Sequence, residues 1–218
     1  MEPSSFPDPR KIRGDVVAIG DDLRVETLRD AYRHGIFPWP HEGMVLPWFS
    51  PRRRTVIVFD ELHVGRSVRK FAKHSGFTFT IDRDFDSVIR ACATPRPDQD
   101  GTWIDEAIIA AYTAFHRAGD AHSVEVWRDG SLAGGLYGID AGGLFTGESM
   151  FYRESGASRL ALLFLIEHLR ARGCTWLDCQ VMTPHMEALG AREIPRARFL
   201  DMLAEAQASG RTLFSRVA

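Results

Sequence analysis

The sequence has little of what marks membrane, secreted or metal-binding proteins. Its 218 residues contain no run of about twenty apolar residues, the length that a membrane-spanning helix requires. The N-terminus has no basic start followed by an apolar stretch, so we expect no secretory signal. The three cysteines and eight histidines show no metal-ligand spacing. We therefore expect a cytoplasmic protein that has neither disulfides nor a metal site and does not bind membranes.

The chain also lacks a strong net charge of either sign. Its formal net charge is −2 at pH 7, which does not by itself indicate a nucleic-acid-binding protein. Basic residues are nevertheless concentrated between residues 50 and 75: Arg52, Arg53, Arg54, Arg66, Arg69, Lys70 and Lys73. The last four have the spacing of one helical face. Such a stripe is either a solvent-exposed face or a contact with phosphate groups.

After a first segment rich in proline, glycine and aromatic residues, the chain shows the periodicity of alternating helices and strands. We predict helices at residues 22–35, 64–73, 84–93, 105–117, 158–170 and 197–208. We predict strands at residues 55–59, 77–81, 123–128, 132–139, 143–150 and 176–180. Prolines predict an irregular segment at residues 35–51 and a loop at residues 95–101. This order predicts an α+β fold, with a small N-terminal domain at residues 1–60 and a mixed sheet covered by helices at residues 61–218.

Two polar residues stand in the buried strand that we expect at residues 176–180. Asp178 and Gln180 occupy positions i and i+2, which point to the same face of a strand. A buried carboxylate or amide needs hydrogen-bond partners, because leaving it without them is costly. The two residues are either a structural pair or a polar site at the end of the strand. Glu148 presents the same alternative, because apolar residues flank it where another predicted strand ends.

Small and aromatic residues suggest two further kinds of contact. The segment from Arg153 to Ser158 leads into a helix whose open N–H groups favour an anion or a carbonyl oxygen. Acyl-CoA-binding acetyltransferases use such a pattern. Trp48, Phe49 and Trp103 either pack inside the protein or stack on a ring of a ligand. Taken singly, these motifs do not decide a function.

Several longer segments form a combination that is more specific than any one motif. They are residues 31–39 (AYRHGIFPW), 48–51 (WFSP), 101–104 (GTWI), 122–127 (HSVEVW), 134–138 (GGLYG), 144–151 (LFTGESMF), 178–181 (DCQV), 189–191 (LGA) and 193–196 (EIPR). Together, and in this order, they resemble the leucyl/phenylalanyl-tRNA–protein transferase family. The resemblance runs from about residue 19 to residue 203, which is nearly the whole chain.

The resemblance implies an enzyme of the cytoplasm that acts on aminoacyl-tRNA. It would move Leu or Phe, with Met as a further donor, to the α-amine of a protein that begins with Lys or Arg. The product is a degradation signal. The resemblance also implies an acetyltransferase-like (GNAT-like) C-terminal domain that uses no CoA, no metal and no other cofactor. We expect a monomer whose partners are aminoacyl-tRNA and acceptor proteins.

The resemblance also implies roles for individual residues. Asp178, Gln180 and Glu148 would be catalytic, with Asp178 holding the Gln180 amide so that it accepts a hydrogen bond from the attacking amine or positions it. The aminoacyl pocket would be lined by Leu136, Phe145, Leu162, Leu165 and Leu177. The terminal adenosine would stack on Trp48, Phe49 and Trp103. The tRNA phosphates would contact Arg52, Arg53, Arg54, Arg66, Arg69, Lys70 and Lys73.

Two other functions remain open at this point. A CoA-dependent N-acetyltransferase on the same fold would use the segment from Arg153 to Ser158, but it has no evident need of the N-terminal aromatic residues. A non-catalytic RNA- or protein-binding module would not need Asp178, Gln180 and Glu148. Transfer of label from leucyl-tRNA to a protein that begins with Arg, with acetyl-CoA as a control, separates the three functions.

Overall fold

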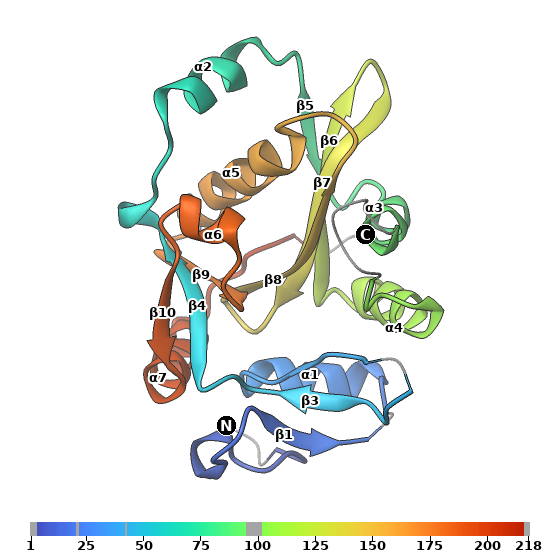
Figure 1. Ribbon diagram of the computed structural model, residues 1–218, viewed down its shortest axis with the longest axis vertical. Helices are drawn as coiled ribbons and strands as arrows, with labels where there is room; N and C mark the ends of the chain where they lie inside the picture. Colours follow the sequence, from blue (N-terminus) through green and yellow to red (C-terminus); the bar gives the residue numbers. More distant parts are fainter. Residues whose placement is uncertain (1–3, 21, 42, 95–101, 216–218) are drawn as a thin grey trace.

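The computed structural model describes residues 4–20, 22–41, 43–94 and 102–215 (Figure 1). Its strands are β1 Val16–Ile19, β2 Phe37–Pro38, β3 Pro47–Phe49, β4 Arg53–Val58, β5 Thr78–Ile81, β6 Ala121–Arg128, β7 Ser131–Asp140, β8 Phe145–Tyr152, β9 Trp176–Gln180 and β10 Arg192–Pro195. Its α-helices are α1 Val25–Arg33, α2 Arg66–His74, α3 Phe85–Ala93, α4 Glu106–Arg117, α5 Ala157–Arg170, α6 Pro184–Ala188 and α7 Arg196–Ala208. Short 3₁₀ helices lie at Pro9–Lys11 and Phe59–Glu61.

A seven-stranded mixed sheet in the order β10-β4-β9-β8-β7-β6-β5 forms the centre of the protein. Its neighbouring strands are antiparallel except for β8 and β9, which are parallel and pair only through Thr146 and Asp178. Helix α5 covers one face of this sheet, and α3 and α4 cover the other (Figure 1). These observations confirm the predicted α+β class with a mixed sheet.

The N-terminal part forms a three-stranded sheet in the order β1-β3-β2. The expectation of irregular structure at residues 35–51 was therefore wrong for β2 and β3. Prolines are tolerated here because the two strands are very short, with Pro38 ending β2 and Pro47 beginning β3. The domain boundary predicted after residue 60 stays a prediction. In the structure β4, which precedes that boundary, already pairs with β9 and β10 of the large sheet.

The predicted helices and strands of the larger part agree with the structure to within a few residues at their ends. Strand β9 has the predicted bounds, and α5 is buried along much of its length, as its nearly continuous apolar sequence predicts. Helix α6 and strand β10 were not predicted. The loop predicted at residues 95–101 lies outside the described residues. Across the described ranges, no helix is both long and apolar enough to span a membrane.

Candidate active site

The candidate site lies where the parallel strands β8 and β9 separate. They pair at Thr146 and Asp178, and two residues further along each strand lie Glu148 and Gln180. Glu148 is the extra residue of a β-bulge, because Ser149 and Gly147 pair with successive residues of β7. Bulges redirect side chains and are common beside active sites. Across the gap, Gln180 Nε2 donates a hydrogen bond of 2.6 Å to Glu148 Oε1.

The backbone of Gln180 is turned out of the strand conformation. Its φ is +62°, in the left-handed region that a residue with a side chain seldom adopts. Its N–H donates to Asp178 Oδ1 at 2.9 Å, and this bond holds the turn. The expected contact between the Asp178 carboxylate and the Gln180 side-chain amide is therefore corrected. Asp178 fixes the backbone of Gln180, and Glu148 binds the amide.

Arg54 is the main partner of Asp178. Its Nε and Nη2 donate to the two carboxylate oxygens at 2.8 and 2.6 Å, and Thr146 Oγ1 donates to Asp178 Oδ2 at 3.1 Å. The Arg54 guanidinium lies between the rings of Phe37 and Phe199, 4.7 and 4.5 Å from their centroids. The Arg54 side chain is 2% exposed and that of Asp178 is 0% exposed. This burial corrects the expectation that Arg54 contacts tRNA phosphates, because a guanidinium enclosed in this way does not reach a phosphate outside.

Burial dominates the electrostatics of Glu148. It raises the pKa of Glu148 from 4.5 to about 8, and the neighbouring negative charge of Asp178 acts in the same direction. Tyr32, Arg54 and Gln180 oppose the shift. Glu148 Oε2 is buried and has no hydrogen-bond partner among the described residues. The carboxyl group is therefore protonated in a large fraction of molecules at neutral pH.

Three tyrosines from different elements surround this carboxyl group. Tyr32 of α1 and Tyr112 of α4 share a hydrogen bond of 2.5 Å between their hydroxyls. Tyr137 of β7 has a buried hydroxyl without a partner among the described residues. Burial, followed by the charge of Glu148, raises the pKa of all three phenols, so they stay neutral hydrogen-bonding groups. No local sequence pattern indicates this cluster, because the three tyrosines are far apart along the chain, although each buried tyrosine hydroxyl needs a partner.

A cavity of about 520 Å³ opens beside Glu148 and Gln180. This volume lies within the usual range for small-molecule sites, roughly 300–1,000 Å³. All five residues of the predicted aminoacyl pocket line it: Leu136, Phe145, Leu162, Leu165 and Leu177. The same five side chains are buried members of the hydrophobic core between the sheet and α5. The structure thus brings together the predicted apolar residues and two of the three predicted catalytic side chains.

The three predicted adenosine-binding aromatics lie in different places. Trp103 lines the cavity, together with Trp39, a residue for which the sequence predicts no role in the site. Trp48 is 2% exposed, packs on Phe6, and donates its indole N–H to Gly20 O at 3.0 Å. This burial corrects the expectation that Trp48 stacks on a ligand. Phe49 packs against Trp39 behind the cavity wall, with ring centroids 5.5 Å apart.

The predicted phosphate contacts divide into two groups. Four cations of α2 are exposed, and the described residues place no carboxylate within ion-pair distance of them: Arg66, Arg69, Lys70 and Lys73. Arg52 and Arg53 are also exposed, but they pair with Asp15 and Glu193 at 3.3 and 3.2 Å. Helix α2 is therefore the stronger candidate surface for phosphate.

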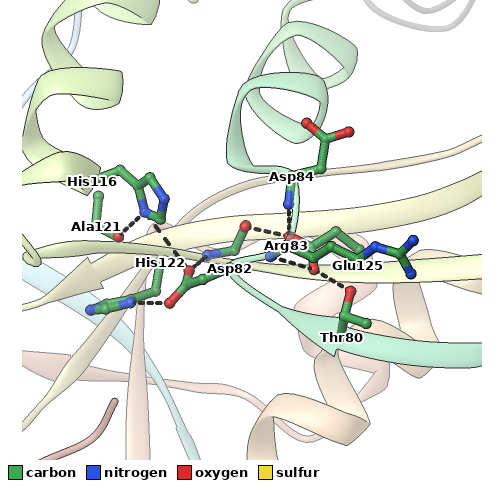
Figure 2. A network of polar contacts seen from close by, with 9 residues as sticks. Thr80, Asp82, Arg83, Asp84, His116, Ala121, His122 and Glu125 are labelled. Atoms are coloured by element: carbon green, nitrogen blue, oxygen red, sulfur yellow. Dashed lines mark hydrogen bonds and ion pairs between the residues drawn. The ribbon is translucent and has the colours of Figure 1, made fainter. Parts of the chain in front are cut away.

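The HSVEVW segment of β6 belongs to a separate polar network (Figure 2). His122 Nδ1 lies 2.6 Å from Asp82 Oδ2, and Thr80 donates its hydroxyl to Glu125 Oε2 at 2.5 Å. Glu125 also accepts the backbone N–H groups of Arg83 and Asp84. None of these side chains lines the cavity. The network therefore supports the turn between β5 and α3, and it gives His122 no role as a catalytic base.

Comparison with known proteins identifies the family. A family model described as "Leucyl/phenylalanyl-tRNA protein transferase" matches residues 56–204, and one described as the N-terminal domain of that protein matches residues 21–52. The chain belongs to the leucyl/phenylalanyl-tRNA–protein transferase family. This membership confirms the predicted enzyme class, and it favours that class over the acetyltransferase and the non-catalytic alternatives.

Individual members of the family are closely similar to this chain. The leucyl/phenylalanyl-tRNA–protein transferase of Pseudomonas fluorescens (strain Pf0-1) is 51% identical over 203 residues, which cover 92% of this chain and 90% of that protein. The one of Chromohalobacter salexigens is 54% identical over 188 residues, which cover 86% and 73%. Among solved structures, L-PGS from Bacillus licheniformis matches with a TM-score of 0.41 and 12% identity, over 88% of this chain and 59% of that chain.

Proposed function

We propose that this chain transfers Leu or Phe, and also Met, from aminoacyl-tRNA to the α-amine of proteins that begin with Lys or Arg. The added residue marks those proteins for degradation. One observation carries the proposal: an apolar cavity opens where β8 and β9 separate, directly beside the Gln180–Glu148 hydrogen bond. Family membership supports the same activity. We place the reaction in the cytoplasm and expect a monomer.

The apolar wall of the cavity suits the side chain of the donor amino acid. Leu165 and Leu177 lie deep in the core, at 1% and 2% exposure. The side chain of a donor amino acid that packs against them is therefore removed from contact with water. Such burial stabilises a bound Leu, Phe or Met by about 1.5–3 kcal/mol. A charged or polar side chain would instead lose its hydration without gaining hydrogen bonds from these leucines. The cavity wall therefore selects apolar donors.

The reaction is the aminolysis of an ester. The acceptor nitrogen attacks the carbonyl carbon, a C–N bond forms, the bond to the ribose oxygen breaks, and a proton from the amine passes to that oxygen. Because Gln180 Nε2 donates to Glu148, the amide oxygen of Gln180 is left to accept a hydrogen bond from the attacking amine. We assign Gln180 this accepting and orienting role.

In the fraction of molecules in which Glu148 is ionised, its carboxylate can accept the proton that the acceptor amine must lose. Its pKa of about 8 is close to that of an α-amine, which is about 7.7–8.0 in unfolded peptides. Proton transfer between groups of matched pKa needs little free energy. Asp178 does not line the cavity, so we assign it an indirect role in which it holds the turn at Gln180.

The tRNA would bind through two kinds of contact. Trp103 lines the cavity and offers a ring on which the terminal adenosine can stack, and Phe49 supports that side of the site through Trp39. The unpaired cations of α2, assisted by Arg52 and Arg53, would bind phosphates of the acceptor end. These assignments follow the family resemblance and the positions of the side chains.

The test is a transfer assay with labelled leucyl-tRNA and a model protein that begins with Arg. A version that begins with Ala is the acceptor control, and acetyl-CoA is the alternative donor. Label should enter only the protein that begins with Arg, and only from the tRNA. Q180A should lower turnover much more than tRNA binding, whereas C179A, at the neighbouring cavity residue, should leave both nearly unchanged. Equal loss of turnover and binding in Q180A, or transfer from acetyl-CoA, would contradict the proposal.

A further inference from the structure

Tyr152 is an exposed aromatic side chain at the edge of the cavity. It ends β8, is 52% exposed, and lines the cavity. The other large apolar side chains that are exposed in the described part of the chain do not line this cavity. Nor does the Tyr152 ring have an aromatic, cationic or hydrogen-bonding partner among the described residues. An isolated exposed tyrosine is ordinary, so its position must decide whether it has a role.

The position of Tyr152 along β8 relates it to the reacting groups. From the bulge at Glu148, the strand continues through Met150 to Tyr152, and all three line the cavity. With a rise of about 3.3 Å per residue, Tyr152 lies roughly 13 Å beyond Glu148. Consider a donor that places its ester at Glu148 and its terminal adenosine in the cavity. The nucleotides that precede this adenosine would then leave the cavity past the ring of Tyr152.

Tyr152 also lies between the cavity and the basic helix α2. The chain leaves β8 at Tyr152, and four residues later Gly156 begins the turn into α5. A Cβ at Gly156 would lie 2.6 Å from Phe71 Cε1, so this turn is in close contact with α2. Figure 1 shows α2 on the same side of the sheet as α5. Along a path that leads out of the cavity, the exposed ring of Tyr152 therefore comes first, and the helix α2 with its unpaired cations comes next.

We propose that Tyr152 is a stacking platform for an unpaired base of the tRNA 3′ end, namely the nucleotide that precedes the terminal adenosine. An exposed ring next to a basic surface is the combination with which proteins hold single-stranded nucleic acid, because every base has a face that stacks. The inference rests on the proposed function. It adds to the cavity a second nucleotide subsite, whose ligand is a nucleobase.

The experiment compares donors of different length. Leucyl-adenosine ends at the first nucleoside, whereas a leucyl dinucleotide and leucyl-tRNA also carry the preceding base. Y152A should raise KM for the two longer donors by about fivefold to 150-fold, the factor that one stacked base contributes. It should leave kcat, and both parameters for leucyl-adenosine, near those of the wild type. Y152F keeps the ring and is the matched control, with all three donors used as by the wild type.

Each other outcome has a defined meaning. Equal losses with leucyl-adenosine and with the longer donors would overturn the inference, because the ring would then act on the first nucleoside or on the fold. Unchanged KM for every donor in Y152A would also overturn it. If the wild-type protein transfers from none of the donors, the proposed function itself fails. Normal turnover of leucyl-adenosine by Y152A shows within the same experiment that the variant is folded.

Discussion

Separating Arg54 from Asp178 should destabilise the protein more than any change at a surface ion pair. Both side chains are buried, at 2% and 0% exposure, and two N–H groups of Arg54 point at the two oxygens of Asp178. Removing one partner of such a pair leaves an uncompensated charge inside the protein. The usual cost is about 3–5 kcal/mol. We expect R54M and D178N each to lower the free energy of unfolding by this amount.

A double-mutant cycle measures the interaction itself. In R54M/D178N neither charge remains, so the loss should be smaller than the sum of the two single losses, with a coupling of about 2 kcal/mol or more. Arg54 also packs between two aromatic rings and donates to Gly35 O at 3.3 Å, so R54M loses contacts that D178N keeps. R54M should therefore be the less stable of the two single variants.

Urea unfolding at equilibrium supplies the free energies, provided that the m-value stays constant among the variants. The neighbouring pair Arg53–Glu193 is the matched control. Its arginine lies on β4 beside Arg54 and its glutamate on the neighbouring strand β10, 3.2 Å apart. The two side chains are 60% and 40% exposed, so this cycle should give less than about 1 kcal/mol. Additive losses at Arg54 and Asp178, within about 0.5 kcal/mol, would refute the account of a buried pair.

Three further results should follow from the structure. Between pH 4.5 and about 8 the folded protein keeps a proton on Glu148 that the unfolded chain has released, so wild-type stability should fall as pH rises through this window. The fall in unfolding free energy between pH 5 and pH 9 should be on the order of a few kcal/mol in the wild type and absent in E148Q, as measured by urea unfolding at the two pH values. L165A should lose about 2–5 kcal/mol of stability, and its selectivity should shift toward Phe when leucyl- and phenylalanyl-tRNA compete. R66A/R69A should reduce the slope of log K against log salt for tRNA binding by about 2, whereas equal slopes in variant and wild type would exclude α2 from the phosphate contact.

The sequence predicts the polar residues of the site but not the way in which they are connected. Asp178 and Gln180 stand out as polar residues in a strand that is otherwise apolar, and Glu148 stands out as the charged residue of its strand. Their geometry depends on the bulge at Glu148 and on the left-handed backbone of Gln180, and neither has a signature in the local pattern. Periodicity assigns a face to each residue of a regular strand, so it fails where a strand is irregular.

The sequence also does not indicate which residues far apart along the chain contact one another. Arg54 stands in a run of three arginines. It is buried because β4 pairs with β9, which brings Arg54 into contact with Asp178, 124 residues further along the chain. Charge alone therefore grouped it with its exposed neighbours. The tyrosines around Glu148 come from three elements that only the folded chain brings together. The apolar wall was predictable in full, because the family resemblance assigned those residues individually.

The apolar wall of the cavity has a consequence for how such an enzyme can change. Its leucines and its phenylalanine hold α5 against the sheet as well as facing the cavity. Under the proposed function, a bound donor would complete an interior that is otherwise underfilled. Widening the space for a larger amino acid would weaken the whole fold, and narrowing it would strain the same contacts. New donor specificities should therefore arise together with compensating substitutions elsewhere in the protein.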